Sequence, residues 1–459
     1  MSSSAFKGAD VSDRLDRAID NALADNRLVG TVVIVARGGK IAYRRAAGFA
    51  DRESQKPMQT DSIFRFASVT KPFVTAAVMR LIEDGVVRLD DPVTRFLPDF
   101  QPRLSDGSVP VISIRHLLTH TSGLGYPFQE GSDGHYRRLD VSDGLDQPGL
   151  SLSENLRRLA AAPLTAAPGS GFRYSLGMDV MGGVVESVTG GSLRDAVRKL
   201  VTDPLGIVDT GFAVADVERL ATNYFNSESV PVRITDGMVV PLDAFNGSLT
   251  FAPSRILDPN SYPSGGGGMV GTAGDVLHFL ETIRLGGGPI LKPETVEMMA
   301  TDQLGPQAAA CGPGWGFGFG WAVLADPHAV PSPQSPGTLH WGGGYGNSWF
   351  IDRANALTVV AMTNTAFEGM SGKFVSATIS EPSREQTACH ALNDVTVRTA
   401  PVSTWTARIP RGQSTIASSR RPGIHDSCVI HWPRARWKSR RSPRPSRPIT
   451  QTRSVSGPA

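Results

Sequence analysis

Ser68 and Lys71 are the residues whose types and spacing most directly suggest chemistry. They stand three positions apart in RFASVTKPF (residues 65–73), and apolar residues follow them at helical spacing. On a helix, residues three apart lie on one face, so the lysine amine can reach the serine hydroxyl. An amine in that place can activate a serine nucleophile without histidine. The alternative is a serine that only begins a core helix, which is common.

The surroundings of Ser68 favour the catalytic interpretation. The same spacing occurs at Ser4 and Lys7, but there it lies in a polar stretch with no helical pattern behind it. Pro72 fits only the first turn of a helix, because further along its ring would clash with an earlier carbonyl. The helix should therefore begin near Ser68. This start places the Ser68 N–H at the positive end of the helix dipole, where an anion forming on a substrate is stabilised.

Two further segments could complete such a site. Tyr174 lies in GFRYSLGMD; a phenol beside a lysine has its ionised form favoured and could carry protons, although a lone tyrosine is more often a core aromatic. Residues 340–350 read HWGGGYGNSWF. Glycines let a strand backbone approach a ligand closely, so an N–H of Gly343 or Gly344 could join that of Ser68 as an oxyanion hole. A glycine run can also be simply a loop.

Together these segments resemble the serine β-lactamase and penicillin-binding-protein superfamily. The resemblance rests on Ser68-x-x-Lys71, Tyr174-Ser175, His340-x-Gly342 and the segment IRHLLTHTSG at 114–123. An S-x-x-K element and a final motif in the K-T-G place are signatures of that superfamily. The chain is most similar to its class C-like esterases, known as family VIII carboxylesterases. The resemblance covers about residues 10–378.

The resemblance implies a role for each matched residue. Ser68 would be the acylated nucleophile, and Lys71 and Tyr174 the pair that activates it and moves protons. As a base, Lys71 would need its pKa lowered from about 10.4 to about 7–8, by burial or by a cationic neighbour. No metal or other cofactor is implied.

The resemblance also implies the residues that would bind substrate. Gly343 matches the second oxyanion donor, although alignment on Trp-Gly-Gly selects Gly344 instead. Trp341 and Tyr126 would line the acyl pocket.

Two departures from the superfamily pattern narrow the expected substrate. Leu176 replaces the usual Asn third in the tyrosine motif, and His340 replaces the usual Lys of the final motif. The first change removes an amide that could hold a substrate amide, and the second removes a permanent cation that could face a carboxylate. We therefore expect a serine ester hydrolase that acts on small neutral esters. The alternatives are a β-lactamase or D-amino-acid peptidase, an acyltransferase on the same fold, and a catalytically silent scaffold.

Other catalytic patterns have less support. There is no G-x-S-x-G motif of the α/β-hydrolase type. His116 and His120 are four apart on an expected short helix, but the sequence lacks the glutamate of H-E-x-x-H, so we expect both to be structural. His425, Cys428 and His431 are three apart, with nothing around them to complete a metal site.

The pattern of elements predicts an α/β fold. A helix is expected at 11–23, strands at 30–36 and 40–46, helices at 151–161, 179–189 and 272–283, and strands at 316–323, 339–341, 348–352 and 356–363. Because strands lie at both ends, we expect an antiparallel sheet built from the N- and C-terminal parts. Its lobe would span about 10–64 and 268–378, with a mostly helical lobe inserted at about 65–267.

The last 79 residues differ from the rest. Residues 381–459 hold 14 basic and four acidic residues, whereas residues 1–380 hold 32 and 39, so the formal charge of +3 averages a basic tail and an acidic remainder. We expect a hydrolase domain at 1–378 and an Arg/Pro/Ser-rich tail at 379–459 that is disordered or read in an altered frame.

No leader or membrane span is apparent, which favours a cytoplasmic protein with a small-molecule substrate and no nucleic-acid or membrane partner for its core. Oligomeric state is not predicted.

Overall fold

The computed structural model describes residues 8–131, 133–227, 230–242, 247–305, 312–329 and 333–368. The predicted tail, all three cysteines and the histidines at 425 and 431 lie outside these residues. The side chains of residues 8–10 lie outside them as well.

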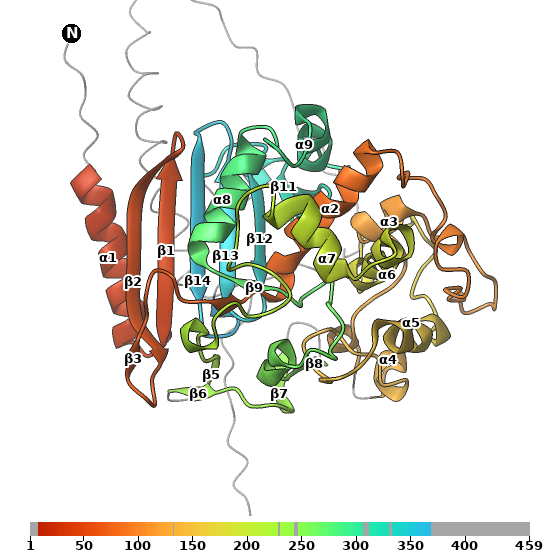
Figure 1. Cartoon of the computed structure of the whole chain (residues 1–459), viewed down its shortest axis with the longest axis horizontal. Helices are drawn as coiled ribbons and strands as arrows, with labels where there is room; N and C mark the ends of the chain where they lie inside the picture. Colours follow the sequence, from red (N-terminus) through yellow and green to blue (C-terminus); the bar gives the residue numbers. More distant parts are fainter. Residues whose placement is uncertain are drawn as a thin grey trace, which may run out of the picture.

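An eight-stranded antiparallel sheet forms the centre of the molecule (Figure 1). Its strands, in spatial order, are β10 (Trp315–Phe317), β11 (Ala322–Leu324), β12 (Leu339–Gly343), β13 (Asn347–Asp352), β14 (Leu357–Thr363), β1 (Gly30–Arg37), β2 (Lys40–Asp51) and β3 (Lys56–Pro57). β1 pairs with β14 in a register that runs from Thr31 opposite Thr363 to Arg37 opposite Leu357. The two ends of the described chain therefore meet in adjacent strands, and the predicted antiparallel sheet from N- and C-terminal parts is confirmed.

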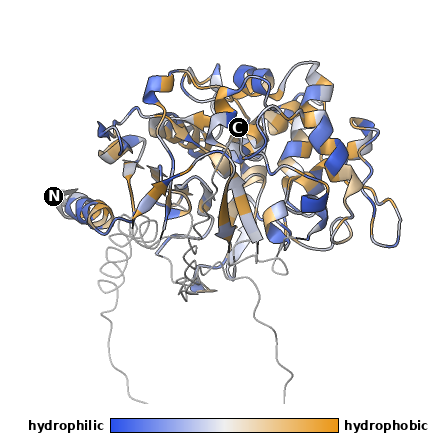
Figure 2. Cartoon of the chain, turned by 90° about the horizontal axis from the view of Figure 1, so that it is seen from below, coloured by the Kyte–Doolittle hydropathy of each residue, from blue (hydrophilic) through white to orange (hydrophobic). Residues whose placement is uncertain are grey.

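Helices cover both faces of the sheet. α1 (Gly8–Ala24) packs Leu15 and Ile19 against apolar residues of β1, β13 and β14 on one face. α8 (Ala273–Arg284) lies on the other face against β14 and β1, and its N-cap Thr272 accepts a hydrogen bond from the Asp275 N–H. In Figure 2 the ribbon of α1, next to the N-terminus, alternates between hydrophilic and hydrophobic residues, as expected of a helix with one face against the sheet.

The middle of the chain is mostly helical and lies at one end of the sheet (Figure 1). Its helices are α2 (Thr70–Glu83), α3 (Ile114–Leu118), α4 (His135–Arg138), α5 (Leu152–Ala161), α6 (Gly177–Thr189) and α7 (Leu193–Val197), and α9 (Pro293–Ala300) follows α8. Three short antiparallel pairs complete the fold: β4 (Phe64–Arg65) with β9 (Val270–Gly271), β5 (Tyr224–Asn226) with β6 (Pro231–Arg233), and β7 (Met238–Leu242) with β8 (Gly247–Phe251). α2 is buried along most of its length, and Phe73 stacks on Phe279 of α8 with ring centroids 4.1 Å apart.

One predicted strand is wrong. Residues 316–323 form the ends of β10 and β11, with a tight turn between them rather than a continuous strand. The Gly318 N–H donates to the Trp321 carbonyl at 2.9 Å, and Gly320 has a φ of +93°. Glycine adopts this left-handed conformation at little cost, which allows the reversal.

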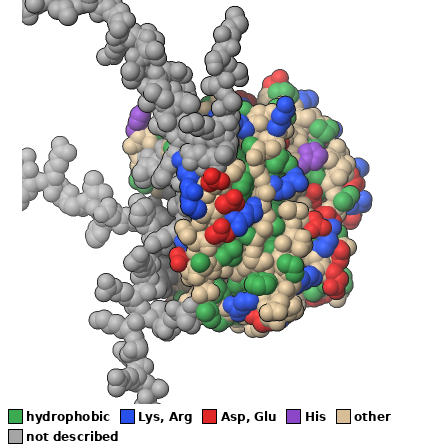
Figure 3. Space-filling view, turned by 90° about the vertical axis from the view of Figure 1, so that its left-hand side faces the viewer, with side chains coloured by type: hydrophobic (Ala, Val, Ile, Leu, Met, Phe, Trp, Pro, Cys, Tyr) green, Lys and Arg blue, Asp and Glu red, His purple; other side chains and the backbone are tan. Residues whose placement is uncertain are grey.

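The face that α1 presents carries mixed charges (Figure 3). Arg45 of β2 forms ion pairs with Asp16 and Asp20 of α1, with N–O distances of 2.9 and 2.5 Å. Because all three side chains are partly exposed, these pairs add only modestly to the apolar packing below them.

Candidate active site

The nucleophile segment is held in a strained turn ahead of α2. Ala67 has a φ of +46°, which is uncommon for a residue with a Cβ, and Ala67–Val69 form a single 3₁₀ turn before α2 begins at Thr70. The Phe66 N–H donates to the Met269 carbonyl at 2.9 Å and holds the segment against β9. Pro72 is the third residue of α2, in the first turn as predicted. Ser68 is thereby left partly exposed at the start of the helix.

Ser68, Lys71 and Tyr174 meet at the Ser68 hydroxyl. The Tyr174 hydroxyl donates to Ser68 Oγ at 2.6 Å, and Lys71 Nζ donates to the same oxygen at 3.1 Å. The three residues come from the Ala67–Val69 turn, α2 and the segment before α6. Two groups that can carry protons thus bond to one serine hydroxyl, which is the arrangement that activates a serine nucleophile.

Lys71 is fully buried beneath this serine. Its Nζ also donates to the Gly266 carbonyl at 2.8 Å, and it lies 4.6 Å from the centroid of the Tyr174 ring. Burial lowers the pKa of Lys71 to about 7, although the charges of Asp179 and Asp143 oppose the shift. A large fraction of Lys71 is therefore neutral near pH 7 and able to accept a proton.

Leu176 and Tyr126 help to hold Tyr174. The Leu176 N–H donates to the Gly125 carbonyl at 3.1 Å, and Leu176 is the fully buried N-cap residue of α6. The ring centroid of Tyr126 lies 5.0 Å from the ring centroid of Tyr174 and 5.5 Å from Lys71 Nζ. Leu176 therefore supports the site from within the core, and Tyr126 belongs to its wall.

Trp341 and His340 are neighbours on β12 with different surroundings. The Trp341 ring lies 5.5 Å from Tyr174 and 5.3 Å from Phe317, which places it on the wall of the site. The His340 ring lies beside Trp315, and its Nδ1 is 2.9 Å from the Trp349 carbonyl. Burial lowers the pKa of His340 to about 4, so it carries no charge at neutral pH. The hydrogen bond of His340 goes to the backbone of β13 and its ring contact to β10, so neither of these contacts reaches Ser68, Lys71 or Tyr174.

The turn between β12 and β13 approaches Ser68 closely. A Cβ built on Gly343 would lie 2.0 Å from the Phe66 carbonyl oxygen and 3.3 Å from Ser68 N, so only glycine fits there. Gly343 pairs with Asn347 in the β12–β13 ladder. Gly344 lies just beyond the strand, and in the described chain its N–H donates no hydrogen bond, nor does the N–H of Ser68.

Sequence reasoning missed Asp179 as a neighbour of the site. This carboxylate is fully buried in the first turn of α6. Burial raises the pKa of Asp179, and this shift is opposed first by a hydrogen bond from the Ser264 hydroxyl, then by the charges of Lys71 and Arg255 and by the Gly266 N–H. The helical pattern at 179–189 placed Asp179 on a helix, but nothing in the sequence indicated that it faces Lys71.

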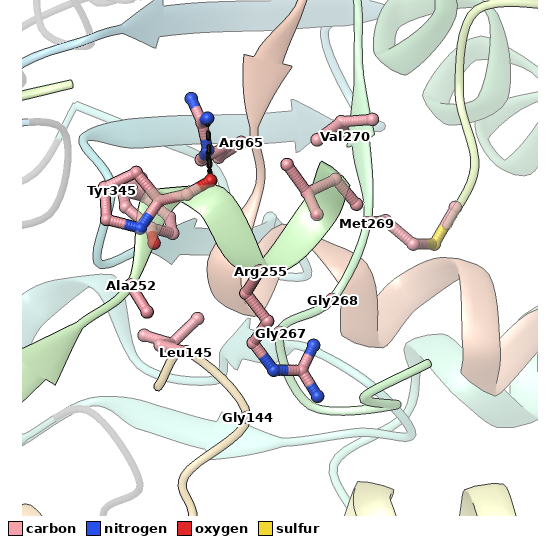
Figure 4. Close-up of a pocket in the computed structure, with 12 residues that line it drawn as sticks. Arg65, Gly144, Leu145, Ala252, Arg255, Gly267, Gly268, Met269, Val270 and Tyr345 are labelled. Carbon is pink, nitrogen blue, oxygen red and sulfur yellow. Dashed lines mark hydrogen bonds between the residues drawn. The ribbon is translucent and has the colours of Figure 1, made fainter. Parts of the chain in front are cut away.

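A small pocket lies behind the nucleophile segment and is lined by Arg65, Leu145, Arg255, Gly267 and Tyr345, among others (Figure 4). The Arg65 guanidinium donates to the Pro253 carbonyl at 3.0 and 2.8 Å, and to Ala221 and Asn223. None of the three catalytic candidates is among the described residues that line it. The pocket thus belongs to the support of β4 rather than to the chemistry.

The described residues contain no group of three or more His, Cys, Asp or Glu side chains that could hold a metal ion. No helix among them is both long and apolar enough to cross a membrane. A serine with a buried lysine and a tyrosine on this sheet and helix arrangement defines the class: a serine hydrolase.

Comparison with known proteins gives the family. The β-lactamase family model matches residues 15–379. Esterase EstB of Burkholderia gladioli is 55% identical over 375 residues, which are 81% of this chain and 95% of EstB. Among solved structures, EstCE1, a hydrolase with promiscuous acyltransferase activity, is 47% identical with a TM-score of 0.80 over 82% of this chain and 99% of EstCE1. The penicillin-binding protein homologue from Pyrococcus abyssi shares the fold at 21% identity, with a TM-score of 0.61 over 82% of this chain and 77% of that one. The chain belongs to the β-lactamase family.

Proposed function

We propose that this chain is a serine ester hydrolase that acts through an acyl-enzyme on Ser68, with small neutral esters as substrates. The observation that carries the proposal is the convergence of Tyr174 and Lys71 on the Ser68 hydroxyl, at 2.6 and 3.1 Å. The esterase activity of EstB and the hydrolase activity of EstCE1 support it.

The chemistry proceeds in two halves. Ser68 Oγ attacks the ester carbonyl carbon while its proton passes to the Lys71–Tyr174 pair. The carbon–oxygen bond to the alcohol then breaks, and the pair returns the proton to the leaving alcohol. A water molecule attacks the acyl-enzyme by the same route and releases the acid. In this scheme Ser68 and Lys71 act as the nucleophile and the base of an S-x-x-K motif.

Gly344 is the better candidate for the second oxyanion donor. Its N–H is unused by the described residues and lies beyond the end of β12, whereas Gly343 pairs with Asn347 in the ladder. Gly343 instead allows the close approach that brings this turn to Ser68. Two N–H donors, from Ser68 and Gly344, would stabilise the charge on the tetrahedral intermediate, and each such donor is typically worth about 10²–10³ in rate.

The substrate class follows from the charges around the site. A neutral His340 and a buried Leu176 offer neither a cation for a substrate carboxylate nor an amide for a substrate amide. Aromatic rings of Trp341, Tyr126 and Phe317 form the wall instead. This lining suits a small uncharged acyl group. We further propose a cytoplasmic enzyme whose core has no nucleic-acid or membrane partner.

Acyl transfer to an alcohol or amine is the second candidate. EstCE1 combines hydrolase and promiscuous acyltransferase activities, and an acyl-enzyme on Ser68 can react with an acceptor in place of water. Product analysis with an added alcohol acceptor separates the two outcomes.

The decisive experiment compares wild type and Ser68→Ala on p-nitrophenyl acetate and butyrate, with nitrocefin in parallel. We expect the variant to lose at least about 10³-fold in kcat/KM on the esters, because it removes the hydroxyl on which Lys71 and Tyr174 converge. A fluorophosphonate should label Ser68 in the folded wild type only. Full ester activity in Ser68→Ala would refute the proposal, and nitrocefin turnover equal to ester turnover would favour a β-lactamase.

A further inference from the structure

His120 contacts the chain on both sides of Tyr174. Its backbone carbonyl accepts the Arg173 N–H at 2.8 Å, and its ring Nδ1 accepts the Ser175 N–H at 3.2 Å. The Ser175 hydroxyl lies 3.1 Å from the same ring nitrogen. Because Nδ1 accepts a backbone N–H, the ring is the tautomer with its proton on Nε2. The residue before and the residue after the phenol are therefore both bonded to one histidine.

The ring of His120 also packs directly on the phenol. Its centroid lies 4.8 Å from that of Tyr174 and 5.3 Å from that of Phe317, and the residue is 1% exposed. Burial first, and then the charge of Lys71, lower the pKa of His120 well below its usual range. The ring is thus neutral at pH 7, and Nδ1 is an acceptor.

The backbone at His120 is unusual as well. Its φ of +55° lies in the left-handed region, which is uncommon for residues other than glycine, although histidine, like asparagine and aspartate, adopts it more often than most. Such a conformation persists only where the surrounding structure imposes it, and it is found most often at functional sites. Here it turns the carbonyl and the ring of one residue toward the same neighbouring segment.

We propose that His120 is a positioning residue for Tyr174: it fixes the peptide groups on either side of the phenol and so sets the approach of the Tyr174 hydroxyl to Ser68. This inference rests on the proposed function and goes beyond it, because it assigns a role to a residue that touches neither substrate nor Ser68. A shift of a catalytic group by about 1 Å can cost roughly 100-fold in rate.

His116 provides a matched control on the same segment. Its Nδ1 also accepts a backbone N–H, that of Ser113 at 3.2 Å, and it completes the capping box of α3. It is therefore a histidine with the same kind of bond, four residues away, but its side-chain bond goes to Ser113 rather than to the chain beside Tyr174. Loss of His116 should affect local stability and leave the chemistry unchanged.

The test compares His120→Gly, His120→Asn and His116→Ala in the full chain. Glycine and asparagine both tolerate the positive φ, but only asparagine carries a side-chain acceptor near the position of Nδ1. We expect His120→Gly to lower kcat on p-nitrophenyl butyrate by roughly 10- to 100-fold with KM little changed. His120→Asn should recover most of the loss, and His116→Ala should stay within about two-fold of wild type.

Labelling and NMR separate this inference from the proposed function. A fluorophosphonate that labels Ser68 in wild type but reacts more slowly in His120→Gly supports both. Failure to label wild type refutes the proposed function itself. Equal rates in His120→Gly and His116→Ala, or no rescue by asparagine, would overturn the role of His120 alone. If the glycine variant does not fold, ¹⁵N NMR of wild-type His120 decides: a protonated Nδ1 would overturn the proposal, and a protonated Nε2 would support it.

Discussion

At the scale of single residues, the proposed chemistry depends on Lys71. Lys71 has no exposed surface, and its hydrogen bonds go to Ser68 Oγ and the Gly266 carbonyl. Burial disfavours its charged form, whereas nearby carboxylates favour it. The balance places its pKa at about 7. Removing one of these carboxylates should therefore lower the pKa of Lys71 further.

Asp179→Asn should lower the pKa of Lys71. The negative charge of Asp179 raises that pKa against the effect of burial, so its loss favours neutral Lys71 at lower pH. Since the acid limb of kcat/KM reports protonation of the base in the free enzyme, the limb should move to lower pH, by about one unit. The measurement is the pH profile of p-nitrophenyl butyrate hydrolysis between pH 5 and 9.

Glu186→Gln is the control for this variant. Glu186 lies seven residues, about two turns, further along the same helix, and its carboxylate accepts the Leu193 N–H at 3.1 Å. Its removal should leave the limb where it is. An unmoved limb in Asp179→Asn, with activity otherwise intact, would show that Asp179 does not act on Lys71.

At the scale of elements, the β12–β13 hairpin brings two glycines with different demands to Ser68. Gly343→Ala would place a Cβ 2.0 Å from the Phe66 carbonyl, so the hairpin or the nucleophile turn must shift. At Gly344 the nearest atoms to such a Cβ are side-chain carbons at 3.7 and 3.9 Å, which is ordinary contact. The same glycine-to-alanine substitution is therefore expected to clash with the backbone at Gly343 and to fit without a clash at Gly344.

We expect Gly343→Ala to lower kcat/KM by about 100-fold or more, because it separates Ser68 from the second N–H donor. Gly344→Ala should stay within about five-fold, since a Cβ leaves its N–H in place. Ester kinetics on both variants, with circular dichroism to verify folding, provide the measurement. Similar losses at both positions would show that the hairpin does not control this geometry.

Elements with a strong local pattern could be predicted, and contacts between distant segments could not. The apolar spacing of α1, the capping Thr272 of α8 and the first-turn Pro72 each indicate their element from neighbouring residues. The break between β10 and β11 depends on the left-handed Gly320, which a strand-like apolar pattern conceals. Motif order indicated Ser68, Lys71 and Tyr174 as candidates, but the contacts of His120 and Asp179 join residues more than fifty positions apart or on separate elements.

At the scale of the whole molecule, every candidate site residue lies within the region that the family model matches, residues 15–379. The pairing of β1 with β14 joins the N- and C-terminal parts of the sheet that carries the site, and β14 ends at Thr363. Arg27 and Glu368 add an ion pair at 2.7 Å at the end of the described chain. We therefore propose that the catalytic unit ends near residue 378. Its α/β lobe would combine residues of about 10–64 and 268–378, and its helical lobe would span about 65–267.

A chain that ends at residue 378 should keep its activity and reverse its net charge. Removing residues 379–459 takes away 14 basic and four acidic residues and leaves 32 basic and 39 acidic ones. The shortened protein should bind an anion exchanger at pH 7.5, whereas the full chain should be held by a cation exchanger or heparin in a salt-dependent way. Because the site and its supporting strands are retained, kcat/KM on p-nitrophenyl butyrate should stay within about two-fold. Ester kinetics and thermal melting of both proteins test this boundary. A large loss of activity or of melting temperature in the shortened protein would show that residues beyond 378 are part of the folded catalytic unit.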